Sequence, residues 1–596
     1  MFRRLREKII RWESKILFIS VFITSISIIS KLLGFLKIHF IARLFATSKE
    51  SDIFFAAFAL PDLVFTLLVV GTVNAALVPI FIRIIKKNQP EVLHTTLNTV
   101  ITLLFGTMIV LLGIIYIFMP QITTWVFTSK EVLKVFDLAT ALTQENQEHY
   151  QELFLNLSRL MLVSPLLLSV SSIFGAYLQA HKRFISTAIA PLMYNLGILL
   201  GITLFVKFAP HFGIYALSYA VLLGTALHFI TQLIGILGLH EKDFSWSFGI
   251  NQHVKDIAKL SLPRIFGLGV EQIAIMFNTF WGFTLGTGAL SVFKYASTLY
   301  LVPVDLISGS FLQVIFPRLN ERAHERAQDN NQSLNKLYWR TLVLLCYVAI
   351  PIAVLFIVLR LPIVRLILGA GRFDWTATIA TSFTLAFFTP AILFQAMAAL
   401  NIRTFYALNN TKIPLLISLT GVISNITFSI LFTNFFSHAS KIMALTASSL
   451  LSLETWQLIA SWFFTRGNSF AAVAGLAFGI SIGLFLEVAL SFWLLSRQTQ
   501  LWAYAKQVVL PLQQIKTALF GGIATFIVGY TTYRITDLLF DSSRVIGVVL
   551  ITGLTGILAG IVYLLATSSV WKQYIQPDKV LRKIVNVKNK YLAKSV

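Results

Sequence analysis

Basic side chains lie inside an apolar segment near the N-terminus. After 16–29, a run with no charged residue, come Lys31, Lys37, His39 and Arg43. An ionisable side chain in the middle of a membrane helix costs about 2.5–3.5 kcal/mol on insertion scales, so it normally faces water, a partner or a polar ligand. Several cations with no acidic residue near them in the sequence fit an anionic ligand better than internal pairing. The segment therefore predicts a transporter for a negatively charged substrate.

Two lysines in this segment are the first candidates for substrate binding. Lys31 and Lys37 are six positions apart, which places them about 120° apart on a straight helix. Gly34 lies between them and could allow a bend that turns both toward one cavity. Snorkelling to the membrane surface is the alternative. Lys31 is too deep in the span for easy snorkelling, whereas both interpretations stay open for Lys37 and Arg43.

Composition places the chain among polytopic membrane proteins. Hydrophobic residues make up 57% of it and charged residues only 12%, and 51 residues are Phe. A soluble domain cannot bury so much apolar surface. The net charge of +23 lies mainly in short loops and the tails, as the positive-inside rule requires, so it does not indicate nucleic-acid binding. Cys346 is the single cysteine, which excludes an intrachain disulfide and a cysteine-based metal site.

Apolar stretches long enough to cross a bilayer predict an all-α fold with about fourteen transmembrane helices. They begin near Ile16, Phe54, Leu93, Leu153, Ile185, Ile214, Ile257, Leu290, Tyr338, Thr376, Pro414, Phe470, Ile515 and Val545. Basic residues recur in every second loop and in both tails. This alternation predicts that both termini lie in the cytoplasm. One exception is the loop that carries Arg360, Arg365 and Arg372, which the same count places outside.

Weak internal repetition predicts two six-helix lobes. Tyr177-Leu-Gln-Ala-His-Lys182, with Pro191 and Asn195 after it, is echoed by Tyr406-Ala-Leu-Asn-Asn-Thr-Lys412, Pro414 and Asn425. Pro79 and Pro317 form a second echo. The two members of each echo are roughly 230–240 residues apart, which is about six spans. This even number implies a parallel repeat, in which substrate lies between the lobes near the midplane. Chance similarity among apolar helices is the alternative.

The expected organisation follows from the spans and the repeat. It comprises a basic cytoplasmic N-terminus (1–15), an N-lobe (16–240), a C-lobe (253–497), two further helices (512–568) and a basic cytoplasmic tail (569–596). Residues 437–468 interrupt the C-lobe with Ser, Thr and aromatic residues. We expect this stretch to be an extracytoplasmic insertion with an interfacial helix at 450–464.

Four other intramembrane residues are candidates with two interpretations each. Arg264 follows Pro263 and either contacts a ligand or forms an ion pair with Glu271, two turns further on. Lys294 either faces the substrate or anchors the outer end of its helix. Asp52 follows Ser51 and is most simply an N-cap of the second span, with substrate or ion binding as the alternative. Asn195 is expected to hydrogen-bond between helices rather than to touch a substrate.

Enzyme signatures are missing from the sequence. It has no glycine-rich loop ending in Gly-Lys-Ser/Thr for nucleotide phosphates and no His-Glu-x-x-His zinc pair. Acidic residues number 25 and lie mostly in loops, so no carboxylate cluster suggests a glycosyltransferase. We therefore expect a non-enzymatic protein without cofactors, in which an ion gradient or the membrane potential would drive any transport. The coupling ion cannot be read from the sequence.

Motifs along spans one to twelve carry a family resemblance. They are Ser30-Lys-Leu-Leu-Gly34, Ile41-Ala-Arg43-Leu-Phe45, Ser51-Asp52-Ile-Phe-Phe55, Leu60-Pro61, Val78-Pro79, Gly175-Ala-Tyr-Leu-Gln-Ala-His-Lys-Arg-Phe184, Ala190-Pro191, Pro263-Arg264, Gly267, Pro362-Ile-Val-Arg365, Gly371-Arg-Phe-Asp374 and Arg403-Thr-Phe-Tyr-Ala-Leu408. Together they resemble the MurJ (MviN) lipid II flippases. The resemblance implies fourteen helices in two lobes around a cationic cavity, with a groove for the lipid tail at the last two helices.

The resemblance also assigns roles, with departures. The family's essential cations on helix one fall on Lys31 and Lys37, where Arg is usual, and its helix-two acid falls on Asp52. Its helix-two Arg pair falls on Phe65 and Thr66. Lysine is a point charge and lacks arginine's bidentate fork, so binding of a pyrophosphate is expected to differ in detail.

Helix eight shows the other departure. The family's arginine falls on Thr298, and Lys294 lies one turn earlier on the same face. We therefore expect Lys294 to supply the missing charge. Residues implied to bind the anionic substrate are Lys31, Lys37, Arg43, Asp52, Arg264 and Lys294.

The expected function is a flippase for lipid II, a polyprenyl-pyrophosphate-linked peptidoglycan precursor, in the bacterial cytoplasmic membrane. Its expected partners are that lipid, membrane lipids and cell-wall synthesis proteins, and not nucleic acid. One alternative is a flippase for another lipid-linked oligosaccharide or a drug exporter. The other is a degenerate family member that serves as a scaffold, an interpretation that the missing Arg pair at Phe65 and Thr66 supports.

Overall fold

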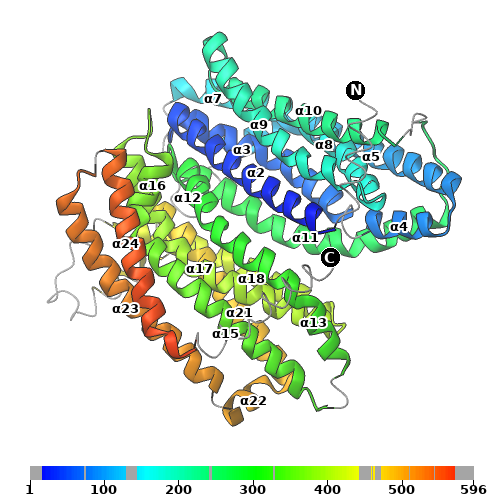
Figure 1. The fold of residues 1–596 in the computed structure, drawn as a ribbon. Helices are drawn as coiled ribbons and strands as arrows, with labels where there is room; N and C mark the ends of the chain where they lie inside the picture. Colours follow the sequence, from blue (N-terminus) through cyan, green and yellow to red (C-terminus); the bar gives the residue numbers. More distant parts are fainter. Residues whose placement is uncertain are drawn as a thin grey trace, which may run out of the picture. The chain divides into compact units, whose positions relative to one another are not determined.

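The computed structural model describes most of the chain. The described residues are 16–72, 76–128, 144–239, 245–325, 329–439, 441, 455, 458–459, 461–463, 471–508, 510–542 and 544–570. The predicted interfacial helix at 450–464 lies largely outside these residues. All regular elements of the described part are helices (Figure 1).

The described part of the chain is a succession of helices. The first part of the chain forms α2 (Ile16–Phe45), α3 (Lys49–Phe65), η1 (Thr66–Val70), α4 (Val78–Lys86), α5 (Pro90–Thr128), α7 (Gln144–Met161), α8 (Val163–Ala180), α9 (Phe184–Phe208), η3 (Pro210–Phe212), α10 (Tyr215–Leu237) and α11 (Gln252–Phe283). The rest forms α12 (Ala289–Val304), η4 (Asp305–Phe311), α13 (Leu312–His324), α15 (Gln332–Val358), α16 (Arg360–Leu368), α17 (Trp375–Ala407), α18 (Lys412–Phe436), α21 (Ala472–Thr499), α22 (Leu501–Val508), α23 (Leu510–Leu539) and α24 (Val545–Ala566).

Local side-chain caps define several helix starts. Ser48 has an extended backbone, and its hydroxyl accepts a hydrogen bond from the Ser51 amide, which makes it the N-cap of α3. Asn251 caps α11 in the same way through the Val254 amide. The carboxylate of Asp374 accepts from the Ala377 amide ahead of α17. Each cap satisfies a backbone donor that the helix itself leaves unpaired.

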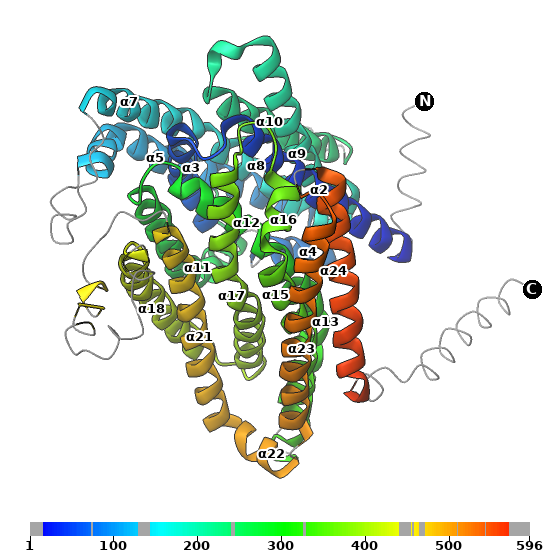
Figure 2. The same ribbon diagram turned by 90° about the vertical axis from the view of Figure 1, so that its left-hand side faces the viewer.

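Thirteen helices in the described part are long and apolar enough to span a membrane. They begin within a few residues of thirteen of the fourteen predicted starts. The fourth span, Gln147–Ala180, joins α7 and α8, which are interrupted at Leu162. The remaining predicted start, Ile515, lies in α23, which is 30 residues long and packs beside α24 and α15 (Figure 2). An architecture of about fourteen transmembrane helices is confirmed.

The internal repeat appears in the turns. Lys182 and Asn409 both have φ of +59°, and each lies in the turn after a helix that ends on alanine. In both turns the next amide, of Arg183 or Asn410, bonds back to the carbonyl five residues earlier. This is the Schellman arrangement that closes a helix end. The echoed sequences therefore adopt the same local structure.

The repeat extends to two interrupted spans. The α3 helix continues through a π-helical segment, η1, and is followed by the short basic helix α4. The α12 helix likewise continues through π-helical η4 into α13. The echoed prolines, Pro79 and Pro317, lie in α4 and α13.

Contacts divide the chain into two compact units. The first comprises Met1–Tyr295, Ile367–Ala380 and Ser429–Leu476, and the second Ala296–Leu366, Thr381–Phe428 and Ala477–Val596. The predicted boundaries at 16–240 and 253–497 stay a prediction. All six candidate site residues belong to the first unit.

Small residues bring two helices of the first unit into close contact. A Cβ added at Gly197 of α9 would lie 2.6 Å from the Cα of Gly224 in α10. One added at Gly201 would lie 2.6 Å from the Cα of Ala220. Such close backbone approach is a common way to pack helices in a membrane, where no hydrophobic effect drives them together. It fixes α9, which carries Asn195.

Candidate functional site

Helix α9 holds the second lysine of the basic segment in place. Helices α2 and α9 pack against each other (Figure 1). The amide nitrogen of Asn195 donates to the carbonyl and the hydroxyl of Ser30, at 3.1 and 3.2 Å. This orients the amide oxygen toward Lys37, whose Nζ donates to it at 3.3 Å. Lys37 also lies 5.7 Å from the ring centroid of Tyr194. The predicted interhelical hydrogen bonds of Asn195 are confirmed.

Lys37 is therefore not a snorkelling residue. Its side chain is half-buried and is positioned by two residues of α9. Lys31 lies six residues earlier, about one and two-thirds turns, and its side chain is exposed on α2. The shared role of the two lysines in binding stays a prediction.

Lys294 lies inside the first unit beside a second polar cluster. Its Nζ donates to the hydroxyl of Thr279 on α11 at 3.0 Å, and Thr279 is fully buried. The contact contradicts the interpretation of Lys294 as a headgroup anchor. Asp62 of α3 interacts electrostatically with Lys294.

Asp62 is the residue that the sequence interpretation missed. It is a half-buried carboxylate inside the second span, and it interacts electrostatically with Lys294 and with Tyr194. Residues from α2, α3, α9, α11 and α12 thus contribute to one polar region. An acidic residue that follows Leu60-Pro61 inside an apolar helix was the available signal.

Asp52 does not cap its own helix. Its side chain is 0% exposed and accepts three hydrogen bonds at the start of α12. The amides of Gly288 and Ser291 donate at 2.6 and 2.7 Å, and the Ser291 hydroxyl donates at 2.6 Å. The prediction that Asp52 is the N-cap of the second span is wrong, because Ser48 fills that position. A carboxylate at a helix N-terminus is favoured by the helix dipole.

Arg264 and Glu271 of α11 interact electrostatically without forming a close ion pair. Both side chains are exposed on α11, and neither forms an ion pair with another residue of the described part. The interaction of Arg264 with Glu271 is therefore a longer-range one, and no close ion pair joins them in the described part. Its role in substrate binding stays a prediction.

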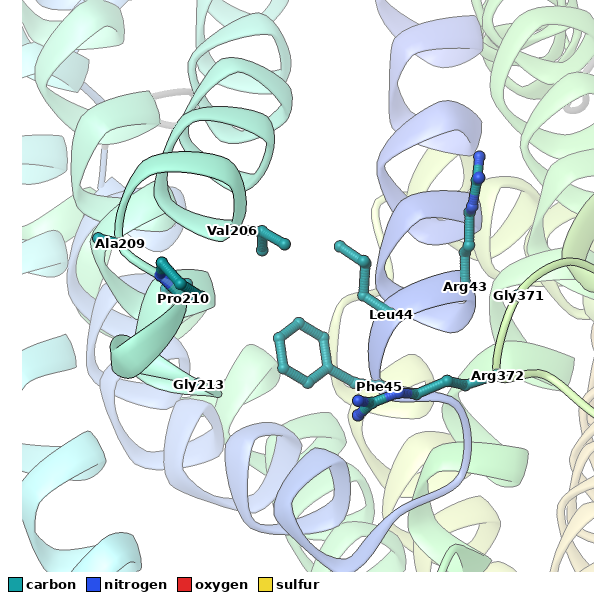
Figure 3. Close-up of a pocket in the computed structure, with 10 residues that line it drawn as sticks. Arg43, Leu44, Phe45, Val206, Ala209, Pro210, Gly213, Gly371 and Arg372 are labelled. Atoms are coloured by element: carbon teal, nitrogen blue, oxygen red, sulfur yellow. The ribbon is translucent and has the colours of Figure 1, made fainter.

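Arg43 lies at the far end of α2, next to the loop after α16. The amide of Arg372 donates to the Arg43 carbonyl at 2.9 Å, and His39 Nδ1 lies 2.6 Å from the Ile367 carbonyl oxygen. Arg43 and Arg372 line a pocket of about 440 Å³ (Figure 3). Arg43 is thus separate from the network around Lys37.

The helix-two departures from the family pattern, Phe65 and Thr66, lie where the helical geometry changes. Phe65 ends α3 and Thr66 begins π-helical η1. The change from α to π geometry therefore coincides with the position of the family's Arg pair. Neither side chain carries a charge, so the helix-two cations of the family pattern have no counterpart at these two positions.

This arrangement suits an anionic ligand. Two lysines with one nearby carboxylate are placed in the first unit on helices that the composition assigns to the membrane. Among the described residues no group of three or more His, Cys, Asp or Glu could hold a metal ion. The polar region therefore offers charge and hydrogen bonds for binding a ligand.

The sequence matches known proteins over most of its length. The family model "Lipid II flippase MurJ" matches residues 41–466. The "Probable lipid II flippase MurJ" of Borreliella burgdorferi is 26% identical over 433 residues, which cover 72% of this chain and 80% of that protein. The "Lipid II flippase MurJ" of Burkholderia cenocepacia is 25% identical over 439 residues, 72% of this chain and 81% of that protein.

Solved structures show the same fold. "Lipid II flippase MurJ, inward closed conformation" aligns with a TM-score of 0.66 at 21% identity, covering 93% of this chain and all of that one. An inward-facing multidrug resistance MATE transporter aligns with a TM-score of 0.57 at 15% identity, covering 80% and 96%. The fold is thus shared more widely than the sequence motifs. Because the family model covers well over half of its residues, the chain belongs to the lipid II flippase MurJ family.

Proposed function

We propose that this protein moves lipid II, a polyprenyl-pyrophosphate-linked peptidoglycan precursor, across the bacterial cytoplasmic membrane. Lys37 is the observation that carries the proposal. It is a cation within a membrane helix, held by Asn195 and Tyr194 and without an ion pair among the described residues. The names of the relatives and the family match support lipid II as the substrate.

Alternating access is the proposed mechanism. The pyrophosphate and its sugar-peptide head bind to the lysines while the lipid tail stays in the bilayer. Two repeated halves then rock about the site, as in other transporters built from repeats. An ion gradient or the membrane potential supplies the energy, and no step makes or breaks a covalent bond.

Complementation of a bacterium depleted of its own lipid II flippase tests the function. We expect this chain to restore growth and cell shape. Failure to restore growth, with the protein present in the membrane at normal levels, would favour the scaffold alternative. That alternative rests on Phe65 and Thr66, which replace the family's Arg pair.

Orientation in the membrane is a separate part of the proposal. Basic loops and tails support cytoplasmic positions for both termini. Cysteines introduced into 437–468 should then react with an impermeant thiol reagent only from outside the cell. Labelling of that segment only from the cytoplasmic side would contradict the proposed topology.

Lys294 is proposed to replace the missing arginine of helix eight. Lys294→Ala should impair complementation, because the anionic head loses a charged contact worth about 1.5–3 kcal/mol. Adding Thr298→Arg should restore part of the growth, since an arginine one turn along the same face can reach the same space. The matched control is Lys336→Ala, on α15. Unchanged growth of Lys294→Ala, or no rescue by Thr298→Arg, would contradict the replacement.

A further inference from the structure

A pocket at the C-terminal end of α2 is separate from the lysine region. It has a volume of about 440 Å³, within the range of ligand sites. Leu44 and Phe45 of α2 face Val206 of α9 and Pro210 of η3 across the space (Figure 3). One wall of the pocket is therefore apolar.

Cationic side chains border the same space. Figure 3 shows that the side chain of Arg372 extends toward Phe45. The side chain of Arg43 extends along α2. Both side chains are exposed, and neither forms an ion pair with a residue of the described part. Asp374, the nearest acid in sequence, accepts a hydrogen bond from the Ala377 amide at the start of α17. The pocket thus combines uncompensated positive charge with an apolar wall.

The loop that carries Arg372 is fixed to α2. The Arg372 amide in the loop donates to the Arg43 carbonyl, and His39 bonds to the carbonyl of Ile367 in the last turn of α16, just before the loop. Gly371 between them has φ of +62°, and a Cβ there would lie 2.5 Å from the Arg43 carbonyl oxygen. Only glycine permits this approach. The guanidinium of Arg372 is therefore presented on a constrained backbone.

We propose that this pocket binds the phosphate of a lipid. Arg372 contacts the phosphate, to which its planar fork is well matched. Arg43 adds positive potential, and the chain of the lipid lies along the apolar wall. A free phosphate ion would leave that wall unused. The lipid is either the carried precursor, bound through its polyprenyl pyrophosphate at release, or a resident phospholipid, and only the first of these rests on the proposed function.

Thiol protection at one pocket residue tests the proposal. In a Cys346→Ala background, Val206→Cys places a single thiol in the pocket. Phe208→Cys is the matched control, because two residues along a helix point to nearly opposite sides. The purified full-length protein is treated with a maleimide in the presence of polyprenyl pyrophosphate, phosphatidylglycerol, uncharged polyprenol or inorganic pyrophosphate.

A phosphate-bearing lipid should slow labelling of the pocket thiol about tenfold and leave the control thiol unchanged. Arg372→Gln should remove the protection, and Arg372→Lys should retain part of it. Protection by polyprenyl pyrophosphate alone identifies the carried lipid, whereas protection by phosphatidylglycerol identifies a resident one.

Three results would overturn the proposal. They are no protection by either phosphate-bearing lipid, equal protection by uncharged polyprenol, and equal protection in Arg372→Gln. Because labelling measures binding at one place, its outcome is independent of complementation. A chain that fails to transport lipid II could still bind lipid phosphate here.

Discussion

Lys37→Ala should abolish complementation of a flippase-depleted bacterium. The variant loses the cation that Asn195 and Tyr194 hold in place, and with it a charged hydrogen bond to the pyrophosphate worth about 1.5–3 kcal/mol. That corresponds to a loss of affinity of about tenfold to a hundredfold. The measurement is growth of the bacterium after its own flippase is depleted. The amount of the variant in the membrane is measured in parallel.

Matched variants separate binding from folding. Lys207→Ala, an exposed lysine at the end of α9, should grow normally. Lys37→Arg should retain activity, because arginine is usual at this position in the family. Asn195→Ala should lower activity less than Lys37→Ala, since it removes only the positioning contact. Lys31→Ala should also fail, and full growth of both lysine variants would falsify the assigned binding role.

Asp52→Ala should destabilise the protein and reduce transport. It leaves the Gly288 amide and the Ser291 amide and hydroxyl without their buried acceptor. Each unsatisfied buried group costs about 1–3 kcal/mol. We expect the purified variant to have a lower apparent Tm than the unchanged protein. Tryptophan fluorescence during heating measures it.

A neighbouring acid provides the control for Asp52. Glu50→Gln, in the same first turn of α3, should leave the apparent Tm unchanged, because Glu50 accepts no hydrogen bond from a residue of the described part. Ser291→Ala, which removes one of the three donors, should have a smaller effect than Asp52→Ala. Melting of Asp52→Ala at the temperature of the unchanged protein would contradict the structural role.

The sequence predicted the spans well because hydropathy is a local property. Thirteen predicted starts agree with observed helices, and the lysines and Asp52 were recognised by their position in or beside apolar runs, whereas Asp62 was missed. The echoed turns at Lys182 and Asn409 were also visible, since a repeated turn repeats its residues.

Partners distant in sequence could not be predicted. Ser51-Asp52 has the composition of a cap, but the chosen cap was Ser48, and Asp52 bonds more than two hundred positions away. Asn195 and Lys37 meet because small residues fix α9, which hydropathy does not reveal. From the sequence, Arg372 was an exception to the charge rule and part of a family motif, and the structure placed it beside α2.

The π-helical segments η1 and η4 carry a consequence for the history of the chain. They follow equivalent spans, and each precedes a short helix that contains one of the echoed prolines. A gene duplication copies irregular turns together with regular ones, whereas two independent insertions would seldom fall at the same place. We infer that the single-lobe ancestor already had this turn before it was doubled. Relatives with a π-helical segment in only one half, in most branches of the family, would argue for independent origins.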